Sequence, residues 1–314
     1  MFEATRLTFY YAVTPIHMGA GSAIGAIDNP IQREVHTQHP MFSGSGIKGA
    51  LRHHFARAWP RNGARANALI ERIFGPETNS SDYAGALSLS DAQLVLLPVR
   101  ALKGAFVYAT CSLALARLRR LADLAEVKVD WEIPPVTQTA LTAGEKLLAR
   151  GCLVLESFEF SAQVNTQVKK IAEWLSTHAF HSVNSFFAEK LRDDLVLLSD
   201  TDFAHFARHA MVVEPHVRIN DESGTADDGG LFYTENVPPE SLLAGLAQAS
   251  VERFKKGEKP AELMDANKIL DVVFDGAGQD KPGIGRGRPL QIGADATSGR
   301  GLVLVKVLRK ETEL

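Results

Sequence analysis

The 314-residue chain has only two cysteines, Cys111 and Cys152. Two cysteines cannot form a disulfide scaffold or a four-cysteine zinc site, and a reducing, cytoplasmic setting is the default for such a chain. No apolar run approaches the ~18 residues that a membrane-spanning helix needs, and the N-terminus lacks the pattern of a signal peptide. Hydrophobic residues at 45% and charged residues at 23% exclude a disordered protein and predict a globular one with a sizeable core.

Charge is distributed unevenly along the chain, although the formal net charge is only −3. Basic residues outnumber acidic ones in residues 1–125 and 281–314, whereas acidic residues dominate residues 192–280. If the two basic ends meet in the fold, their shared face could attract a polyanion that the net charge conceals. Chance clustering of surface charge is the alternative.

The hydrophobic pattern predicts an α+β fold. Leu7, Phe9, Tyr11 and Val13 have the period of two that is typical of a strand with one buried face. An apolar run at residues 302–308 predicts a last strand, which we expect to lie beside the first. No linker or internal repeat divides the chain. The pattern also predicts strands at 86–97 and 153–160, helices at 112–125, 168–178 and 201–211, and a long hairpin at 214–239.

A long loop separates the first strand from a predicted helix. Residues 17–46 hold five glycines and no clear periodicity, and loops of this length inside a compact domain tend to be functional. Apolar residues then recur at helical spacing, so we expect a helix that starts near Gly46 with Ser45 as its cap.

The start of this helix is a candidate phosphate site. The segment Gly44-Ser-Gly-Ile-Lys-Gly49 matches a dinucleotide-binding loop only weakly, because Pro40 leaves no room for a strand before it. A glycine-rich turn into a helix N-terminus nevertheless offers free backbone amides and a favourable dipole to a phosphate. Lys48 and Arg52 share one face of this helix. A solvated basic face is the alternative.

A second glycine-rich segment precedes the last strand. Six glycines lie between Gly283 and Gly301, interleaved with Arg286, Arg288 and Arg300. Glycines let a backbone approach a phosphate chain closely, and arginines supply charge and hydrogen bonds. A tight turn would explain the glycines but not the arginines.

Single residues give weaker signals. Asp28 precedes Asn29-Pro30, a common turn context, so a structural role is favoured on this observation alone. His17 stands alone after the first strand. His205 and His209 have metal-ligand spacing on a predicted helix, but nothing near them in the sequence completes a set. The sequence has no serine nucleophile elbow and no Cys/His nucleophile context.

Two stretches of the sequence resemble the RAMP superfamily of CRISPR effector subunits. The first is TPIHMGAGSAIGAIDNPIQREVHTQHPMFSGSGIKGALR, residues 14–52, and the second is LQIGADATSGRGLVLV near the C-terminus. Together they frame almost the whole chain. The PIQRE-x-H element makes the chain most similar to the fourth-named, backbone subunit of the type III-B (Cmr) complex.

The resemblance implies one RAMP domain over residues 1–314, with a modified ferredoxin-like (RNA-recognition-motif-like) palm. A β-hairpin thumb at about 213–240 would be an insertion in this domain. It also implies that copies of the chain stack into a filament along a CRISPR guide RNA, together with other subunits of the complex and with no membrane association. Each thumb would separate one base pair between the guide RNA and the target RNA. This places the chain in antiviral defence, as an RNA-binding hydrolase.

Residue by residue, the resemblance implies that Asp28 is catalytic in endoribonuclease cleavage of the target RNA at regular intervals, as a base or as a ligand of Mg²⁺ or Mn²⁺. His17 and Glu235 match positions that would assist. Val237 stands where a tyrosine is expected two residues after the glutamate, which weakens the case for a shared catalytic set in the thumb. The residues expected to bind RNA are Arg33, Gly44, Ser45, Gly46, Lys48, Arg52, Arg286, Arg288 and Arg300.

Two other functions remain open at this point. A guide-RNA scaffold without nuclease activity would have the same basic helix, and only a test of Asp28 separates the two. A guide-processing endoribonuclease of the same superfamily would normally rely on a histidine and act as a monomer.

Overall fold

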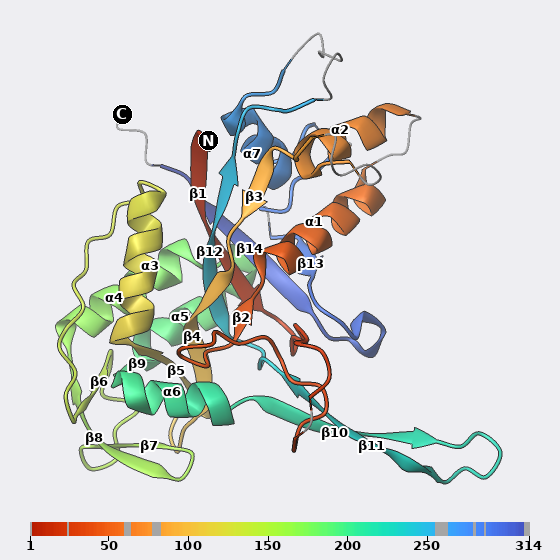
Figure 1. Ribbon diagram of the computed structural model, residues 1–314. Helices are drawn as coiled ribbons and strands as arrows, with labels where there is room; N and C mark the ends of the chain where they lie inside the picture. Colours follow the sequence, from red (N-terminus) through yellow and green to blue (C-terminus); the bar gives the residue numbers. More distant parts are fainter. Residues whose placement is uncertain are drawn as a thin grey trace.

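The structure, a computed structural model, describes residues 2–23, 25–59, 64–76, 83–254, 263–278, 281–285 and 287–310. These residues form a mixed α+β fold with a large, mainly antiparallel sheet and a two-stranded ribbon that projects from one end (Figure 1). The strand order in the sheet is β13-β14-β1-β12-β4-β5-β9-β6-β8-β7. In addition, β2 pairs with β4 and β3 pairs with β12. Its strands are β1 (Ala4–Ala12), β2 (Met41–Phe42), β3 (Leu87–Leu89), β4 (Ala92–Arg100), β5 (Phe106–Cys111), β6 (Ala140–Thr142), β7 (Cys152–Leu155), β8 (Phe158–Val164), β9 (Leu195–Leu198), β12 (Leu242–Ala249), β13 (Pro289–Gln291) and β14 (Leu302–Leu308).

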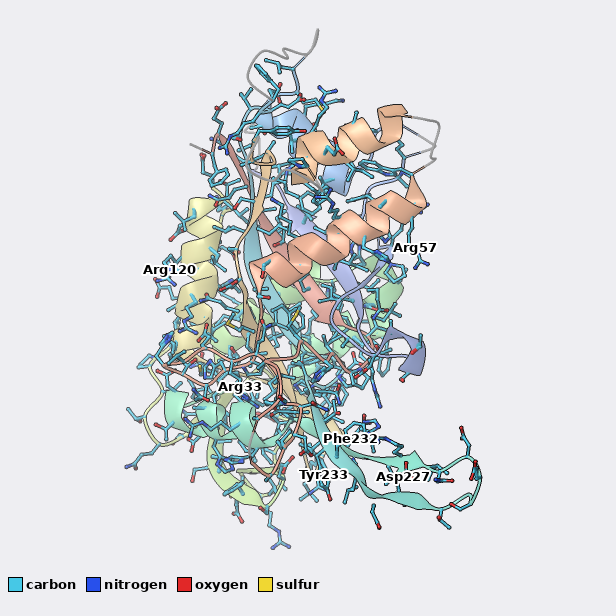
Figure 2. The ribbon with its side chains drawn as sticks, turned by 45° about the vertical axis from the view of Figure 1, so that its right-hand side comes forward. Arg33, Arg57, Arg120, Asp227, Phe232 and Tyr233 are labelled. Carbon is cyan, nitrogen blue, oxygen red and sulfur yellow. The ribbon has the colours of Figure 1, made fainter. Side chains whose placement is uncertain are left out.

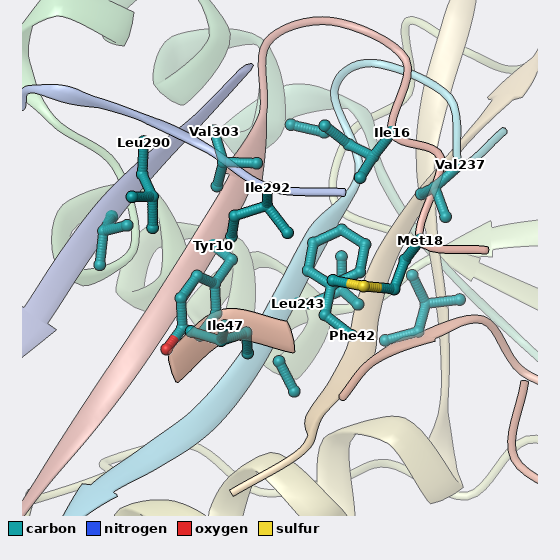
Figure 3. Packing of buried hydrophobic residues seen from close by; sticks show 14 of the residues in the cluster. Tyr10, Ile16, Met18, Phe42, Ile47, Val237, Leu243, Leu290, Ile292 and Val303 are labelled. Carbon is teal, nitrogen blue, oxygen red and sulfur yellow. The ribbon is translucent and has the colours of Figure 1, made fainter. Parts of the chain in front are cut away.

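Helices cover both faces of this sheet. The cores of both faces are apolar, and Figure 3 shows part of one of them, where Tyr10 packs near Ile47 and Leu243. The helices are α1 (Gly44–Ala58), α2 (Ala64–Phe74), α3 (Ser112–Leu124), α4 (Thr166–His178), α5 (Ser185–Asp194), α6 (Asp200–His209) and α7 (Ala266–Phe274), with short 3₁₀ turns at Ser182–Asn184 and Ala296–Ser298. Residues of α1 and α7 belong to one core, and residues of α4 and most buried residues of α3 belong to the other.

The first and last strands are neighbours, as predicted. In β1, Tyr10 is opposite Val305 of β14 and also pairs with Leu243 of β12. The expectation that β1 has one buried face was wrong, because residues 7–12 are all buried. Phe9 contributes to one core and Tyr10 to the other, since the helices cover both faces.

Two predicted strands are interrupted. Residues 86–97 divide into β3 and β4, both of which pair with β12. At the break, the side-chain Oγ of Ser90 accepts a hydrogen bond from the Leu246 amide of β12 at 2.8 Å, in place of a strand carbonyl. Residues 153–160 form the β7–β8 hairpin rather than one strand, since Glu156 adopts a left-handed φ of 52° in the turn between them. Helices α3, α4 and α6 lie within two residues of their predicted bounds.

The cap of α1 was also mispredicted. Ser43 is the N-cap residue, and its Oγ accepts a hydrogen bond from the Gly46 amide at 3.3 Å. Gly44 is buried, and a Cβ at this position would lie only 2.2 Å from Leu89 O of β3. The first glycine of the motif therefore permits close packing of the helix start on β3.

The predicted hairpin is present. Strands β10 (Val212–Ile219) and β11 (Ala226–Asn236) form a separate antiparallel ribbon, outside the main sheet. Figure 1 shows that the ribbon extends well beyond the body of the molecule. Its outer part is exposed on both faces, including the acidic tip at residues 220–228.

Candidate functional site

The loop after β1 pairs with the free edge of the hairpin. Asn29 and Thr234 of β11 form a parallel bridge. The Asn29 amide donates to Tyr233 O at 3.0 Å, and the Glu235 amide donates to Asn29 O at 3.0 Å. The base of the hairpin thus fixes the position of the loop that contains Asp28, which sequence reasoning did not anticipate.

Asp28 is half-buried at this edge. Its Oδ2 accepts a hydrogen bond from the Tyr233 backbone amide at 2.7 Å, and its carbonyl accepts one from Ala23 at 2.9 Å. One carboxylate oxygen therefore orients the side chain. The other oxygen, Oδ1, makes no hydrogen bond with the described residues and is the atom that could meet a substrate or an ion.

His17, in the loop after β1, contacts the same strand. Its Nδ1 lies 2.7 Å from Glu235 O, and since a carbonyl only accepts, Nδ1 carries the proton. In the neutral ring Nε2 then holds the lone pair and can exchange a proton with a ligand. His17 and Asp28 therefore contact adjacent parts of β11, which brings the two predicted residues to one place.

Glu235 has two intramolecular partners. Its side chain is 5% exposed, forms an ion pair with Arg33, and accepts a hydrogen bond from the Ile31 amide at 3.0 Å. Arg33 also donates to Gln38 O at 2.7 Å and to Ala207 O of α6 at 2.8 Å. The Arg33 guanidinium, which was expected to bind RNA, thus makes intramolecular contacts. These contacts link the loop to α6 and to the hairpin.

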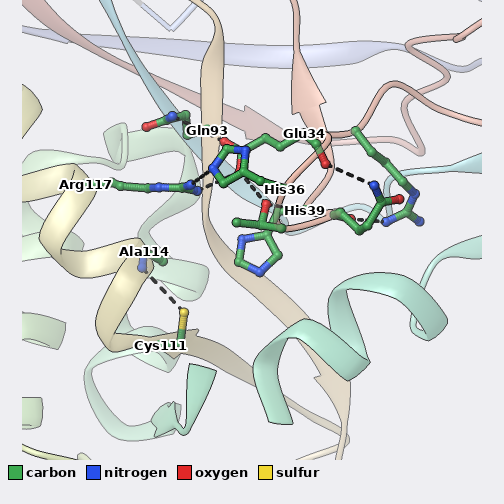
Figure 4. A network of polar contacts seen from close by, with 10 residues as sticks. Glu34, His36, His39, Gln93, Cys111, Ala114 and Arg117 are labelled. Carbon is green, nitrogen blue, oxygen red and sulfur yellow. Dashed lines mark hydrogen bonds and ion pairs between the residues drawn. The ribbon is translucent and has the colours of Figure 1, made fainter. Parts of the chain in front are cut away.

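The PIQRE-x-H element attaches this loop to α3. Figure 4 shows the side chain of Arg117 extending from α3 toward Glu34 and His36. Arg117 donates to Glu34 at 2.7 Å and lies 2.9 Å from His36 Nε2. Hydrogen bonds from Thr37 and Arg117 hold the pKa of the Glu34 carboxyl below its usual value, against the effect of burial. Both charges are buried, so this ion pair holds the loop against α3. The spacing of the motif residues in the sequence did not indicate this structural role.

The residues fit a divalent ion only in part. Among the described residues, no three His, Cys, Asp or Glu side chains are placed to hold a metal, and this includes His205 and His209, whose rings lie 4.6 Å apart. Mg²⁺ is commonly held through one or two carboxylates, with water and substrate phosphates as its other ligands. Asp28 fits that arrangement as a single protein ligand.

The basic face of α1, formed by Lys48 and Arg52, is half-buried. Lys48 donates to Leu87 O at 2.8 Å, and Arg52 donates to Gly75 O at 3.0 Å. Burial lowers the pKa of Lys48, and the nearby cations Arg52 and Arg253 lower it further. Three cations thus gather here, including Arg253, which no sequence pattern indicated. Such a cluster is stabilised by an anion.

The amides at the start of α1 are mostly occupied. The Gly44 amide donates to Asp91 Oδ1 at 2.8 Å, and the Gly46 amide donates to the Ser43 cap. Ser45 is exposed. Few backbone amides at the predicted phosphate site are therefore free to bind an anion. The basic side chains of α1 are the stronger candidates for anion binding.

The C-terminal glycine loop packs against His17. Gly293 has a φ of 80°, and a Cβ there would lie 2.3 Å from His17 O. Arg300 forms an ion pair with Glu214 of β10, so this loop also contacts the hairpin. Arg288 is exposed and lies close enough to His54 to lower the pKa of that imidazole, together with burial. Arg286 lies outside the described residues.

Comparisons with known proteins identify the family of this chain. The sequence model of the RAMP superfamily matches residues 9–304. The CRISPR system Cmr endoribonuclease Cmr4 of Pyrococcus furiosus is 33% identical over 303 residues, covering 96% of this chain and 94% of that protein. The CMR subunit Cmr4 of Saccharolobus solfataricus is 24% identical over 255 residues, covering 75% and 81%.

Solved structures show the same fold. Oligomeric Cmr4 from Pyrococcus furiosus has a TM-score of 0.69 at 25% identity, with 98% of this chain and 99% of that chain covered. A chain of the type III-B Cmr-beta complex bound to cognate target RNA has a TM-score of 0.70 at 17% identity, with 98% of each chain covered. No described helix is long and apolar enough to cross a membrane. The chain belongs to the RAMP superfamily and, within it, to the Cmr4 family of type III-B CRISPR effector subunits.

Proposed function

We propose that this backbone subunit binds guide RNA as a filament of identical copies and cleaves the paired target RNA at regular intervals, with Asp28 as the catalytic residue. The observation that carries the proposal is the position of Asp28, whose carboxylate is fixed by Tyr233 at the base of the projecting hairpin. A thumb that separates guide and target at this point would present the freed nucleotide to that carboxylate. The relative from Pyrococcus furiosus is named an endoribonuclease, which supports the cleavage step.

The fold suits such a role. The main sheet would form the ferredoxin-like palm, and β10 and β11 would form the thumb. Contacts between copies and with other subunits of the complex would assemble the palms along the guide RNA, as the oligomeric relative suggests. The cation cluster of Lys48, Arg52 and Arg253 would hold guide phosphates.

The chemistry requires two proton transfers. The 2′-hydroxyl attacks the adjacent phosphorus, so the O2′–P bond forms as the P–O5′ bond breaks, leaving a cyclic phosphate and a 5′-hydroxyl. Asp28 Oδ1 is placed to accept the 2′-hydroxyl proton, and His17 Nε2, when protonated, could supply the proton that the leaving oxygen needs. Alternatively, Asp28 Oδ1 would hold a Mg²⁺ or Mn²⁺ ion, which would supply charge stabilisation at the phosphate.

Replacing Asp28 tests the proposal. Asp28→Asn keeps the size of the side chain and an oxygen that can accept from the Tyr233 amide, so folding and guide binding should persist. We expect target cleavage in assembled, guide-loaded particles to fall by at least ~100-fold, as for loss of a positioned acid–base group. Cleavage at the wild-type rate would favour the second candidate, a guide-RNA scaffold whose nuclease is another subunit.

A guide-processing endoribonuclease is less well supported. Such an enzyme would normally rely on a histidine and act as a monomer, whereas the similar Cmr4 structure from Pyrococcus furiosus is oligomeric. Incubating the isolated chain with precursor guide RNA would test this function directly, because a processing enzyme would cut the precursor as a monomer.

A further inference from the structure

A cavity lies between α6 and the PIQRE-x-H segment of the loop after β1. Its volume is about 500 Å³, within the range of small-molecule sites. Histidines line it from both sides, with His36 and His39 on the loop and His205 and His209 on α6. Neither the carboxylate of Asp28 nor the basic face of α1 lines this cavity, so the proposed function leaves these side chains without a role.

One stripe of α6 faces the cavity. Thr201, His205 and Arg208 recur at helical spacing and are exposed, whereas Phe203 and Phe206 on the other side of the helix are buried. The Arg208 guanidinium makes no ion pair or hydrogen bond with the described residues. A guanidinium of this kind presents two parallel N–H groups, which match two oxygens of a phosphate.

Two exposed histidines lie beside this arginine. The ring centroids of His205 and His209 are 4.6 Å apart, and His205 also contacts the ring of Phe158 edge to face at 5.0 Å. Histidine side chains gain a positive charge as the pH falls from 8 to 5. Two charged imidazoles this close repel each other unless an anion lies beside them, so we expect protonation of the pair and binding of an anion to occur together.

The loop adds a neutral donor. His36 Nε2 accepts a hydrogen bond from Arg117 at 2.9 Å, so Nδ1 carries the ring proton (Figure 4). This Nδ1–H makes no hydrogen bond with the described residues, and the side chain is exposed. His39 differs, because it is buried against Phe203 and burial lowers its pKa, so it remains uncharged.

The cavity has an acidic end and a basic end. Asp200 is in the first turn of α6 and Arg208 is in the last turn, roughly 12 Å away along the helix. The Asp200 carboxylate accepts a hydrogen bond from the Leu113 amide at 2.9 Å, so the N-terminus of α3 stabilises its charge. An anion should therefore bind at the Arg208 end.

The neighbouring charged groups do not compensate this basic end. Glu159 lies between Phe158 and Phe160 in β8, and since side chains alternate along a strand, it points away from α6. The charged groups of the loop, α3 and the start of α6 have partners inside the chain: Glu34 with Arg117, Arg33 with Glu235, and Asp202 with Ser199 Oγ.

We infer that the basic end of this cavity binds a phosphodiester of RNA. Arg208 would form the ion pair, and His36, His205 and His209 would donate hydrogen bonds, the last two in their protonated form. The inference rests on the proposed function in naming RNA as the source of the phosphate, and it adds a contact separate from Asp28 and from α1. Because protonated histidines take part, binding should weaken as the pH rises from 6 to 8.

NMR of the isolated, histidine-labelled chain tests the site itself. The probe is the dinucleotide uridylyl-uridine, whose phosphodiester keeps one negative charge at both pH 6 and pH 8, and uridine is the control without a phosphate. At constant ionic strength we expect saturable shifts of the His205 and His209 resonances, with an affinity at least ~10-fold lower at pH 8. Equal affinities at the two pH values, or equal shifts with uridine, would contradict the inference.

Two variants locate the site. Arg208→Gln should reduce the affinity for the dinucleotide by about ten-fold, as for loss of one charge-assisted hydrogen bond. Lys170 is an exposed cation on α4 and does not line the cavity, so Lys170→Gln is the matched control and should keep the wild-type affinity. Equal effects of the two substitutions would show a general charge effect and no site at α6.

Neutral linkages in the RNA identify the strand. In guide-loaded Asp28→Asn particles, which keep the target intact, single methylphosphonate linkages are placed along the guide in one series and along the target in another. We expect one linkage per repeat, in one of the two strands, to weaken RNA binding at pH 6 in particles with Arg208 but not in those that also carry Arg208→Gln. If every sensitive linkage stays sensitive in both particles, the cavity does not hold an RNA phosphodiester. The readout is binding, so a failure of the proposed cleavage at Asp28 would not affect it.

Discussion

Arg33 and Glu235 are 202 positions apart in the sequence and form an ion pair at the base of the hairpin. The side chains are 15% and 5% exposed, so the pair is buried. Because Glu235 also accepts from the Ile31 amide, the pair fixes the segment that follows Asp28 against β11. We interpret Glu235 as a positioning residue for Asp28.

Breaking this pair should destabilise the chain. Arg33→Ala leaves the Glu235 carboxylate buried without its partner, which typically costs about 3–5 kcal/mol. We expect a lower denaturation midpoint for the isolated chain in urea. The double variant Arg33→Met/Glu235→Gln removes both charges and should recover part of the loss, and a double variant no more stable than the single one would mean that the pair is not the source of the effect.

The basic face of α1 should set the salt dependence of guide binding. Lys48→Ala/Arg52→Ala should weaken binding of all guide sequences alike and reduce the log–log salt slope by about one to two, as expected when one or two phosphate contacts are lost. The measurement is guide affinity over a range of salt concentrations, with folding checked because both side chains also bond to carbonyls.

A matched control for this variant is Arg119→Ala/Arg120→Ala. Both arginines are exposed on α3, whose core lies on the other face of the sheet from that of α1 (Figure 2 shows Arg120). The same loss of charge there should leave the slope unchanged. Equal changes in the two variants would indicate a general charge effect instead of a phosphate grip.

Shortening the hairpin tip should abolish the separation of the guide and target RNA strands without unfolding the chain. Residues 221–226 are exposed and lie outside the main sheet, so deletion of residues 221–230 with a two-residue turn in their place should preserve the fold. We expect chemical probing of the bound RNA to lose its periodic unpaired bases. Persistence of the same periodic pattern would show that the tip has no part in separating the strands.

Glu240 should make stability depend on pH. Burial raises the pKa of its carboxyl to about 7, and the side chain accepts a hydrogen bond from the Tyr11 hydroxyl. The folded state therefore binds a proton more tightly than the unfolded state, and the free energy of unfolding should fall as pH rises from about 4.5 to 7.

Glu240→Gln tests this dependence. The amide remains neutral at every pH, so the variant should lose that part of the pH dependence and gain about 1–2 kcal/mol over wild type at pH 8, a value reduced for partial solvent exposure. The measurement is urea denaturation at pH 5 and pH 8. Parallel pH profiles for the two proteins would rule out Glu240 as the titrating group.

The sequence by itself determined the fold class, the terminal strands, four of the helices (α1, α3, α4 and α6) and the hairpin. Each of these depends on local periodicity: apolar residues at spacing two or at helical spacing predict an element wherever it lies in the chain. The family resemblance likewise rested on contiguous motifs in residues 14–52 and near the C-terminus.

Only the tertiary structure decided what the polar residues contact. Sequence spacing gave no sign that Arg33 pairs with Glu235, that Arg117 pairs with Glu34, or that Arg253 joins Lys48. These contacts join segments far apart in the chain, and periodicity contains no information about such pairings. The cap of α1 and the two faces of β1 were mispredicted for the same reason, because neighbouring elements decide which amides are bonded and which faces are covered.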